Sequence, residues 1–229
     1  MPRAPTAMTR TPDSKKSYNS SDDSRTNSTG YNPLKFFFAG KEYHCGKTTY
    51  YPSDDSYLLA ECVKIGKGEN VIDMGCGAGL QSLNALFLGA ARVIAADING
   101  EALSVTLQNC RNSGLKGRVI CRKSDLFSAI PEKAGVIIFN PPYVASGKIR
   151  FTDLDGGGRM GREVLGRFLA QMPSHLREGG RCFFLQTDFN GYKKTEQALR
   201  EQGMEFSVLA RKRGFFEEIA VYECRKISR

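Results

Sequence analysis

The stretch Val71–Gly79, which reads VIDMGCGAG, decides the fold because it joins an apolar strand to a glycine-rich turn. Val71–Met74 is short and apolar, as a buried strand requires, and Leu80–Leu88 after the turn is typical of a helix. Alternating glycines let the backbone pass close beneath a ligand at the N-terminus of that helix. The spacing is G-x-G-x-G rather than the dinucleotide fingerprint G-x-G-x-x-G.

An acidic residue, Asp73, precedes the first glycine of this turn. A carboxylate there suits a cationic cofactor better than a pyrophosphate, because it neutralises an ammonium group or lies near a sulfonium. We therefore expect Asp73, Gly75 and Gly77 to bind a cofactor. Taken alone, a glycine-rich strand-to-helix turn serves many ligands, so the rest of the chain has to narrow the choice.

Strand and helix patterns alternate along the chain. Apolar runs predict strands over Val71–Met74, Arg92–Asp97, Arg118–Arg122, Val136–Phe139 and Cys182–Leu185. Helical patterns cover Leu80–Leu88, Glu101–Asn112, Glu163–Leu176 and Lys193–Gln202, and an antiparallel hairpin is expected from Glu205–Arg211 and Phe215–Cys224. This alternation predicts the α/β class, with a doubly wound, Rossmann-like, mostly parallel sheet.

The first 30 residues have a different composition from the rest. They contain no Val, Ile, Leu or Phe and are rich in Ser, Thr and Asn, so residues 1–30 are predicted to be a disordered polar tail. Residues 31–229 then form one domain. It opens with a hairpin of Leu34–Phe38 and Glu42–Cys45 and a helix from Ser53 to Val63, with Ser53 as its N-cap.

Composition excludes several classes of protein. No apolar run approaches the roughly 18–20 residues of a membrane-spanning helix, so we expect no membrane contact. Seven cysteines without a CxxC pair indicate reduced thiols in a cytoplasmic protein, and two histidines argue against a protein-bound catalytic metal. The net charge of +9 favours contact with RNA, a ribosome or an acidic partner.

Acidic residues also follow the next two predicted strands. Asp97 and Ile98 end the second strand, where a carboxylate can hold a ribose diol. Asp125 and Leu126 follow the third, where the acid can accept the exocyclic amine of an adenine while the leucine packs on the ring. Either acid alone could be a helix cap or a turn residue. Together with Asp73 they predict an adenosine-bearing cation, namely S-adenosylmethionine.

The fourth strand ends in Asn140-Pro141-Pro142-Tyr143, the most informative stretch of the chain. Two prolines stiffen the turn and remove two backbone donors. The Asn140 side-chain oxygen and the Pro141 carbonyl can then accept both hydrogens of a planar –NH2 group, while the Tyr143 ring offers a surface for it. A proline-terminated strand with an Asn cap is the structural alternative. We predict that all four residues act in methyl transfer to such a nitrogen.

With these motifs the chain resembles the class I S-adenosylmethionine-dependent methyltransferases. More narrowly, it is similar to the HemK family of protein-(glutamine-N5) methyltransferases in its short archaeal and eukaryotic form. The resemblance rests on Tyr51–Leu59 (YPSDDSYLL), the glycine turn, Asp97–Asn99, Asp125-Leu126, Asn140–Tyr143, and Gly157-Gly158 with Gly161–Val164 (GREV). It implies a seven-stranded sheet with an antiparallel C-terminal hairpin. It also implies cofactor contacts by Ser56, Asp73, Gly75, Asp97, Asp125, Leu126 and Asn140.

The resemblance further implies a substrate and a partner. The family methylates the glutamine of the GGQ motif in class-1 translation release factors. Its short members pair with a small zinc-binding activator subunit, which adds a strand to the exposed third strand of the sheet, here Arg118–Arg122. Relative to the family, the Asp155–Met160 loop is altered by an extra glycine and a methionine.

Two other functions fit parts of the sequence. An RNA or DNA amine methyltransferase, acting on adenine N6 or guanine N2, would use the same chemistry at Asn140 and would suit the positive charge. Only 86 residues follow Tyr143, however, which leaves no room for a target-recognition domain. A catalytically silent scaffold would predict a broken cofactor turn or a degraded Asn140–Tyr143 segment, and both are intact.

Overall fold

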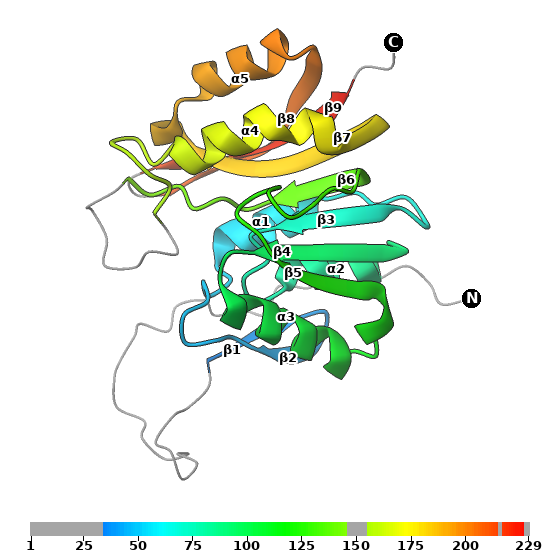
Figure 1. Ribbon diagram of the computed structural model, residues 1–229. Helices are drawn as coiled ribbons and strands as arrows, with labels where there is room; N and C mark the ends of the chain where they lie inside the picture. The colour runs from blue at the N-terminus through cyan, green and yellow to red at the C-terminus, as the bar shows by residue number, and fades with distance from the viewer. Residues whose placement is uncertain (1–33, 146–154, 215–216, 227–229) are drawn as a thin grey trace, which may run out of the picture.

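A seven-stranded sheet forms the centre of the protein, with strands in the order β5-β4-β3-β6-β7-β9-β8 (Figure 1). The computed structural model describes residues 34–145, 155–214 and 217–226. Its central strands are β3 (Asn70–Met74), β4 (Arg92–Asp97), β5 (Val119–Lys123), β6 (Ala134–Phe139), β7 (Leu176–Thr187), β8 (Met204–Arg213) and β9 (Glu218–Lys226). The strands from β5 to β7 pair in parallel, and β9 pairs antiparallel with β7 and β8. The predicted fold class is confirmed.

Helices cover both faces of this sheet. In the described part of the chain they are α1 (Asp54–Cys62), α2 (Leu80–Phe87), α3 (Gly100–Asn112), α4 (Glu163–His175) and α5 (Tyr192–Glu201). Helices α1, α2 and α3 share one core with one face of the sheet, and α4 and α5 share a second core with the other face. Figure 1 shows α4 and α5 along the β7–β9 half and α3 beside β5.

The two cores explain why the parallel strands have continuous apolar sequences. In β3, Val71 packs into the core of α1–α3, whereas Ile72 packs into the core of α4 and α5. Val136 and Ile137 of β6 lie beside them in register and divide in the same way. A strand buried on both faces has no polar side to alternate with, which is the pattern that the sequence predicted.

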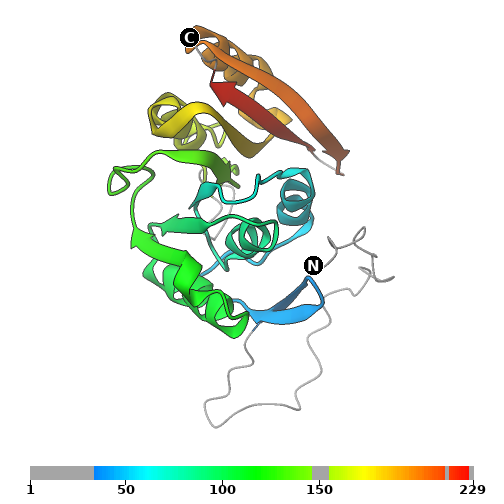
Figure 2. The same ribbon diagram turned by 90° about the vertical axis from the view of Figure 1, so that its right-hand side faces the viewer.

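The predicted N-terminal hairpin is present as β1 (Lys35–Phe38) and β2 (Lys41–His44). Phe36 and Tyr43 are buried, and their rings stack with centroids 5.5 Å apart. The Tyr43 hydroxyl lies 3.0 Å from Ser113 Oγ, just beyond α3, and Figure 2 shows the hairpin beside that helix. The hairpin therefore extends the core of α1–α3 rather than forming a separate unit.

Most predicted strands have different bounds in the structure, and two of these differences have a clear physical cause. The strand predicted over Arg118–Arg122 is β5, and it begins at Val119 because a 3-10 turn, Lys116–Arg118, precedes it. The strand predicted over Cys182–Leu185 is the longer β7. Its additional residues include Leu176, which pairs with Ala134 of β6. The pairing register shifts between Ala134 and Val136, so that the β7 residues between Leu176 and Arg181, two of them glycines, are accommodated.

Some predictions fall on residues that are not described. The tail of residues 1–30 lies outside the described residues, as does Phe215 at the start of the last predicted strand. Within residues 34–145, 155–214 and 217–226, no helix has the length and apolar content needed to cross a membrane.

Candidate functional site

The glycine turn joins β3 to α2 at the carboxyl end of the sheet. Gly75, Gly77 and Gly79 have φ angles of 63°, 52° and 88°, in the left-handed region that side chains avoid. A Cβ on Gly77 would meet no atom within 4 Å, so the backbone there faces open space. The turn is tied to β4, because Cys76 N donates to Ala96 O at 3.0 Å. The sequence therefore builds a bare backbone surface beside α2.

Asp73 lies beneath this turn, near the end of β3, and is almost fully buried. Its Oδ2 accepts a hydrogen bond from Ser82 Oγ of α2 at 2.6 Å. The pKa of Asp73 is raised to about 7. Burial is the main cause and the charge of Asp97 adds to it, whereas the Ser82 hydrogen bond offsets part of the increase. A cation brought close to Asp73 would favour its ionised form. Direct contact of Asp73 with a cofactor stays a prediction.

Asp97 ends β4 and faces the glycine turn. Its Oδ2 accepts from Gly77 N at 3.0 Å, and its Oδ1 accepts from Asn99 N at 2.8 Å. Burial raises the pKa of Asp97, and the backbone hydrogen bonds lower it. The neighbouring Ile98 is 66% exposed, so it presents an apolar surface next to the carboxylate. Contact of Asp97 and Ile98 with a cofactor stays a prediction.

Asp125 and Leu126 follow β5, as the sequence predicted. The Asp125 carboxylate is half exposed and forms an ion pair with Arg167 of α4 at 2.6 Å. Leu126 is buried and has a φ of 48°, an unusual conformation for a side-chain residue, and its carbonyl accepts from Ser124 Oγ. A non-glycine residue held in the left-handed region is often found at functional turns.

Asn140 stands at the end of β6, next to β3. Its Nδ2 donates to Asp55 Oδ2 at 3.1 Å and to Ser56 Oγ at 3.2 Å. Its Oδ1 is buried and, within the described residues, is among the side-chain atoms that have no hydrogen-bond partner. Leaving a buried acceptor unpaired costs about 1–3 kcal/mol, so this oxygen would gain from an N–H donor. Ser56, predicted to contact the cofactor, lies beside the same amide.

Tyr143 ends the Asn140–Tyr143 segment and is held through its hydroxyl. The hydroxyl donates to Asp55 Oδ2 at 3.1 Å. Burial raises the pKa of Tyr143 above its usual value, and the negative charge of Asp55 raises it further. The phenol therefore stays protonated and acts as a donor at neutral pH. Sequence analysis predicted a role for the ring but not this anchor.

Two residues of the site escaped the sequence analysis. Asp55 was included only as part of the Tyr51–Leu59 motif, with no role of its own, and Asn190 was not noticed. The buried Asn190 side chain donates from Nδ2 toward the carbonyls of Tyr143 at 3.0 Å, Met160 at 2.8 Å and Gly161 at 3.0 Å. The available signal was a polar residue shortly after β7, the same signal that identified Asp97 and Asp125.

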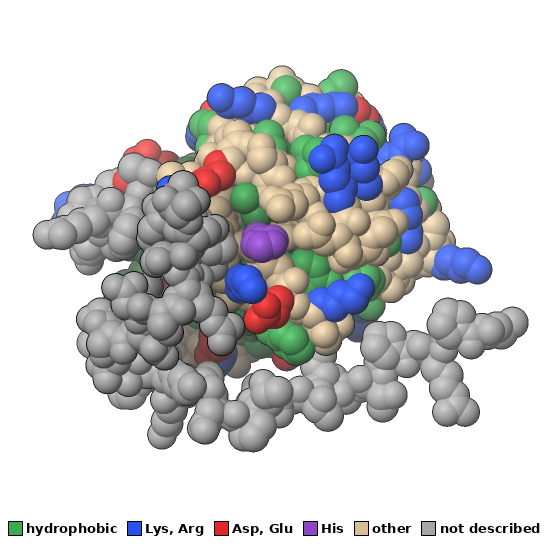
Figure 3. All heavy atoms as spheres, turned by 90° about the horizontal axis from the view of Figure 1, so that it is seen from below, with side chains coloured by type: hydrophobic (Ala, Val, Ile, Leu, Met, Phe, Trp, Pro, Cys, Tyr) green, Lys and Arg blue, Asp and Glu red, His purple; other side chains and the backbone are tan. Residues whose placement is uncertain are grey.

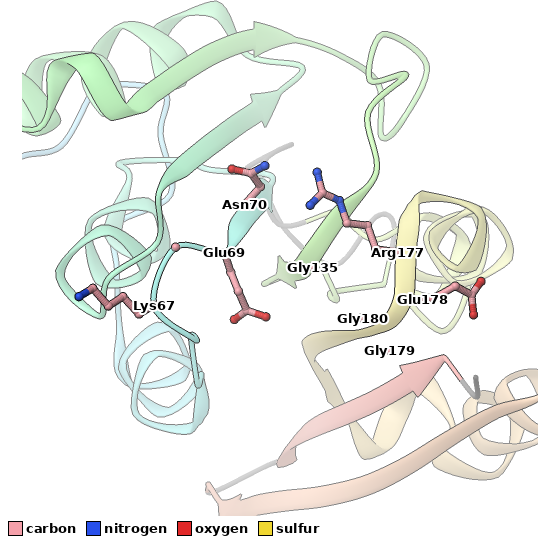
Figure 4. Close-up of a pocket in the computed structure, with 9 residues that line it drawn as sticks. Lys67, Glu69, Asn70, Gly135, Arg177, Glu178, Gly179 and Gly180 are labelled. Atoms are coloured by element: carbon pink, nitrogen blue, oxygen red, sulfur yellow. The ribbon is translucent and has the colours of Figure 1, made fainter. Parts of the chain in front are cut away.

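The donor set fits S-adenosylmethionine at the carboxyl end of the sheet. Open backbone lies at Gly77, carboxylates lie at Asp97 and Asp125, and an unpaired acceptor lies at Asn140. A hollow of about 300 Å³ lies at the opposite end, lined by Glu69, Asn70 and Gly135 among others (Figure 4). In Figure 4 the Arg177 side chain extends toward Asn70. None of the predicted site residues lines that hollow.

Comparison with known proteins identifies the family. The family model of the methyltransferase small domain matches residues 53–217. The putative protein N5-glutamine methyltransferase of Methanocaldococcus jannaschii is 33% identical over 177 residues, covering 75% of this chain and 89% of that protein. The human methyltransferase HEMK2 is 25% identical over 191 residues, covering 77% of this chain and 89% of that protein.

Solved structures share the fold. The E. cuniculi Mtq2–Trm112 complex, described as responsible for methylation of the eRF1 translation termination factor, has a TM-score of 0.59 at 23% identity. The match covers 78% of this chain and 99% of that chain. The predicted HemK-type recognition, methyltransferase activity and cofactor are therefore confirmed. The chain belongs to the methyltransferase small domain family, as a HemK-type class I methyltransferase whose methyl donor is S-adenosylmethionine.

Proposed function

We propose that this enzyme methylates the side-chain amide nitrogen of a glutamine, the one in the GGQ motif of a class-1 translation release factor. The observation that carries the proposal is the buried Oδ1 of Asn140 after β6, which accepts no hydrogen bond from any residue in the described part of the chain. A primary amide offers two N–H donors in one plane, and an acceptor fixed at this position would orient them. The glutamine methyltransferases among the relatives favour an amide over other planar amines. Such a substrate places the enzyme in the cytoplasm.

The residues of the site would act by positioning. When bound, S-adenosylmethionine supplies the methyl group, and Asp97, Ile98, Asp125 and Leu126 are the candidates to hold its adenosine part. Asn140 Oδ1, with the Pro141 carbonyl, would hold the amide hydrogens so that the nitrogen lone pair is directed at the methyl donor. The proton leaves after transfer, so no strong general base is required.

A partner fits the open edge of the sheet. Strand β5 pairs only with β4 among the described strands, and Ile120, its second residue, is 36% exposed. The opposite edge, β8, carries Arg211, Lys212 and Arg213 at its exposed end, which discourages edge pairing. We therefore place the small zinc-binding activator subunit on β5, at Val119–Lys123 rather than at Arg118–Arg122.

RNA is the second candidate substrate, because the chain carries a net charge of +9. On the face shown in Figure 3, Lys and Arg side chains are interspersed with uncharged ones. Electrostatic binding of RNA would give an affinity that falls steeply with added salt. The positive charge thus favours contact with RNA, and with the ribosome that contains it.

Methyl transfer to defined substrates tests the proposal. Radiolabelled S-adenosylmethionine would be incubated with the enzyme and either a class-1 release factor or bulk RNA, with and without the small zinc-binding subunit. We expect label on the release factor, and its loss when the GGQ glutamine is changed to alanine. Asn140→Ala should abolish transfer while cofactor affinity stays within about threefold, since the side chain acts on the substrate. Label on RNA alone would refute the glutamine assignment.

A further inference from the structure

Asp55, the second residue of α1, is a buried carboxylate surrounded by hydrogen-bond donors. It is 2% exposed. Its Oδ1 accepts from the Tyr50 hydroxyl at 2.9 Å, Ser53 Oγ at 2.8 Å and Ser56 N at 2.6 Å. Its Oδ2 accepts from Asn140 Nδ2 and from the Tyr143 hydroxyl, both at 3.1 Å.

The two carboxylate oxygens of Asp55 therefore bind different parts of the chain. Oδ1 is fixed by residues close in the sequence, between Tyr50 and Ser56. Oδ2 reaches across to the first and last residues of the Asn140–Tyr143 segment, 85 and 88 positions along the chain. One carboxylate oxygen thus holds both ends of the segment to which we assign the reaction.

The contact with Asp55 determines which way the Asn140 amide points. A carboxylate accepts hydrogen bonds and has none to donate, so the group of Asn140 that faces it must be Nδ2. The Asn140 oxygen is then forced to the other side, where it is the buried acceptor without a partner among the described residues. Without the carboxylate, the amide could turn and present its N–H groups to a substrate that is itself a donor.

The hydrogen-bond donors around Asp55 are neutral groups: hydroxyls, an amide and a backbone N–H. In the described part of the chain, no Lys or Arg lies within ion-pair distance of Asp55, whereas its neighbour Asp54 pairs with Lys212 at the surface. Burying a carboxylate among neutral donors is costly, and an apolar side chain would fill such a position more cheaply if only packing were required. The pKa of Tyr143, raised by burial and by Asp55, keeps its hydroxyl a donor to Oδ2.

We infer that Asp55 is a positioning residue for methyl transfer: it sets the orientation of the Asn140 amide, so that the oxygen and not the nitrogen meets the substrate. The inference deepens the function proposed above and rests on it for the identity of the acceptor. It assigns Asp55 no contact with the substrate.

Asp55→Asn is the sharpest variant, because it keeps the shape and reverses one contact. The new amide must keep its oxygen toward Ser56 N, so its NH2 group takes the place of Oδ2 and faces Asn140. Asn140 would then accept a hydrogen bond from this NH2 group by turning its own Oδ1 toward residue 55. We expect kcat to fall about 100-fold, the scale of losing one preorganised group, while the Kd for S-adenosylmethionine changes less than about threefold.

Asp54→Asn is the matched control, since it removes the neighbouring acid of the same helical turn and only a surface ion pair. Its kcat should match that of the unaltered enzyme. Thermal melting of all three proteins checks the fold. A kcat for Asp55→Asn within about threefold of the unaltered enzyme would overturn the inference, as would equal losses in both variants.

A measurement on the unaltered enzyme is independent of whether the variant folds. The side-chain NH2 of Asn140, assigned in a nitrogen–proton spectrum by its absence in Asn140→Asp, should exchange slowly with deuterium. Rapid exchange, as in an exposed amide, would refute the contact with Asp55. The kinetic comparison of Asp55→Asn with Asp54→Asn uses whichever substrate accepts the labelled methyl group. It can therefore be made even if the glutamine of a release factor is not the substrate. If none accepts label, the exchange measurement decides.

Discussion

Asp73 should make cofactor binding depend on pH near neutrality. In the free protein, burial raises the pKa of Asp73 to about 7, so the carboxyl is largely protonated below that pH. A cationic cofactor bound nearby stabilises the ionised form and lowers the pKa in the complex. Binding below pH 7 must therefore expel a proton. Affinity should be greatest above pH 7 and should fall as the pH drops through that value.

The size of the effect follows from the same pKa. At about pH 6 the free protein is roughly nine-tenths protonated at Asp73, so the Kd should be about tenfold above its high-pH limit, or about 1.4 kcal/mol. The tenfold difference requires that the pKa of Asp73 in the cofactor complex lies well below 6. Removing the Ser82 hydrogen bond, which lowers the pKa, should move the midpoint to higher pH in Ser82→Ala.

Titration calorimetry measures both the affinity and the expelled proton. S-adenosylmethionine would be titrated at about pH 6, 7 and 8 in two buffers of different ionisation enthalpy, with Asp73→Asn as the reference. The amino group of the cofactor also titrates, but it does so with both proteins, and their difference isolates Asp73. We expect release of about 0.9 proton at pH 6 only in the unaltered enzyme. Parallel profiles for the two proteins would refute the reasoning.

Three further substitutions test the site, and a fourth, Gly166→Ala, serves as a control. Asp97→Ala removes a half-buried carboxylate with two backbone partners and should raise the Kd for S-adenosylmethionine about 10–100-fold in calorimetry, with a change below about threefold contradicting its role. Gly161 has a φ of 58°, and in Gly161→Ala the added Cβ would clash with the Tyr143 carbonyl, so both Tm and kcat should fall. In Gly166→Ala the added Cβ, in helix α4, meets nothing within 4 Å, so the free energy of unfolding measured with denaturant should rise by up to about 1 kcal/mol. Asn190→Ala leaves carbonyls near Tyr143 unpaired and should cost about 1–3 kcal/mol of stability together with turnover; unchanged kinetics would contradict the assigned contact.

Much of the fold could be predicted because it depends on local patterns. Strands buried on both faces are continuous apolar runs, and the tips of parallel strands meet at one edge, so Asp97, Asp125 and Asn140 could be placed together without coordinates. Bounds were less predictable where pairing extends a strand beyond its apolar part. The N-terminal part of β7 contains Glu178 and glycines, and it is a strand because Leu176 finds Ala134 on β6.

The contacts within the site could not be predicted, because they join residues that no local pattern relates. Asp55 reads as a helix-terminal acid, and only the approach of α1 to β6 turns it into a partner of Asn140. Ser53 was predicted to cap α1, and it occupies the N-cap position, but its hydroxyl bonds to Asp55 instead of to the helix backbone. The ion pair of Asp125 with Arg167 likewise depends on how α4 packs.

The open edge at β5 also bears on how much active enzyme a cell can keep. An exposed apolar residue such as Ile120 on a strand at the edge of the described sheet favours association with other chains that are not fully assembled. Copies made in excess of the activator would therefore be prone to aggregation and removal by proteases. Under the proposed pairing, the amount of the smaller protein limits the amount of active methyltransferase. Extra transcription of this chain alone would then increase degradation of the protein rather than its abundance.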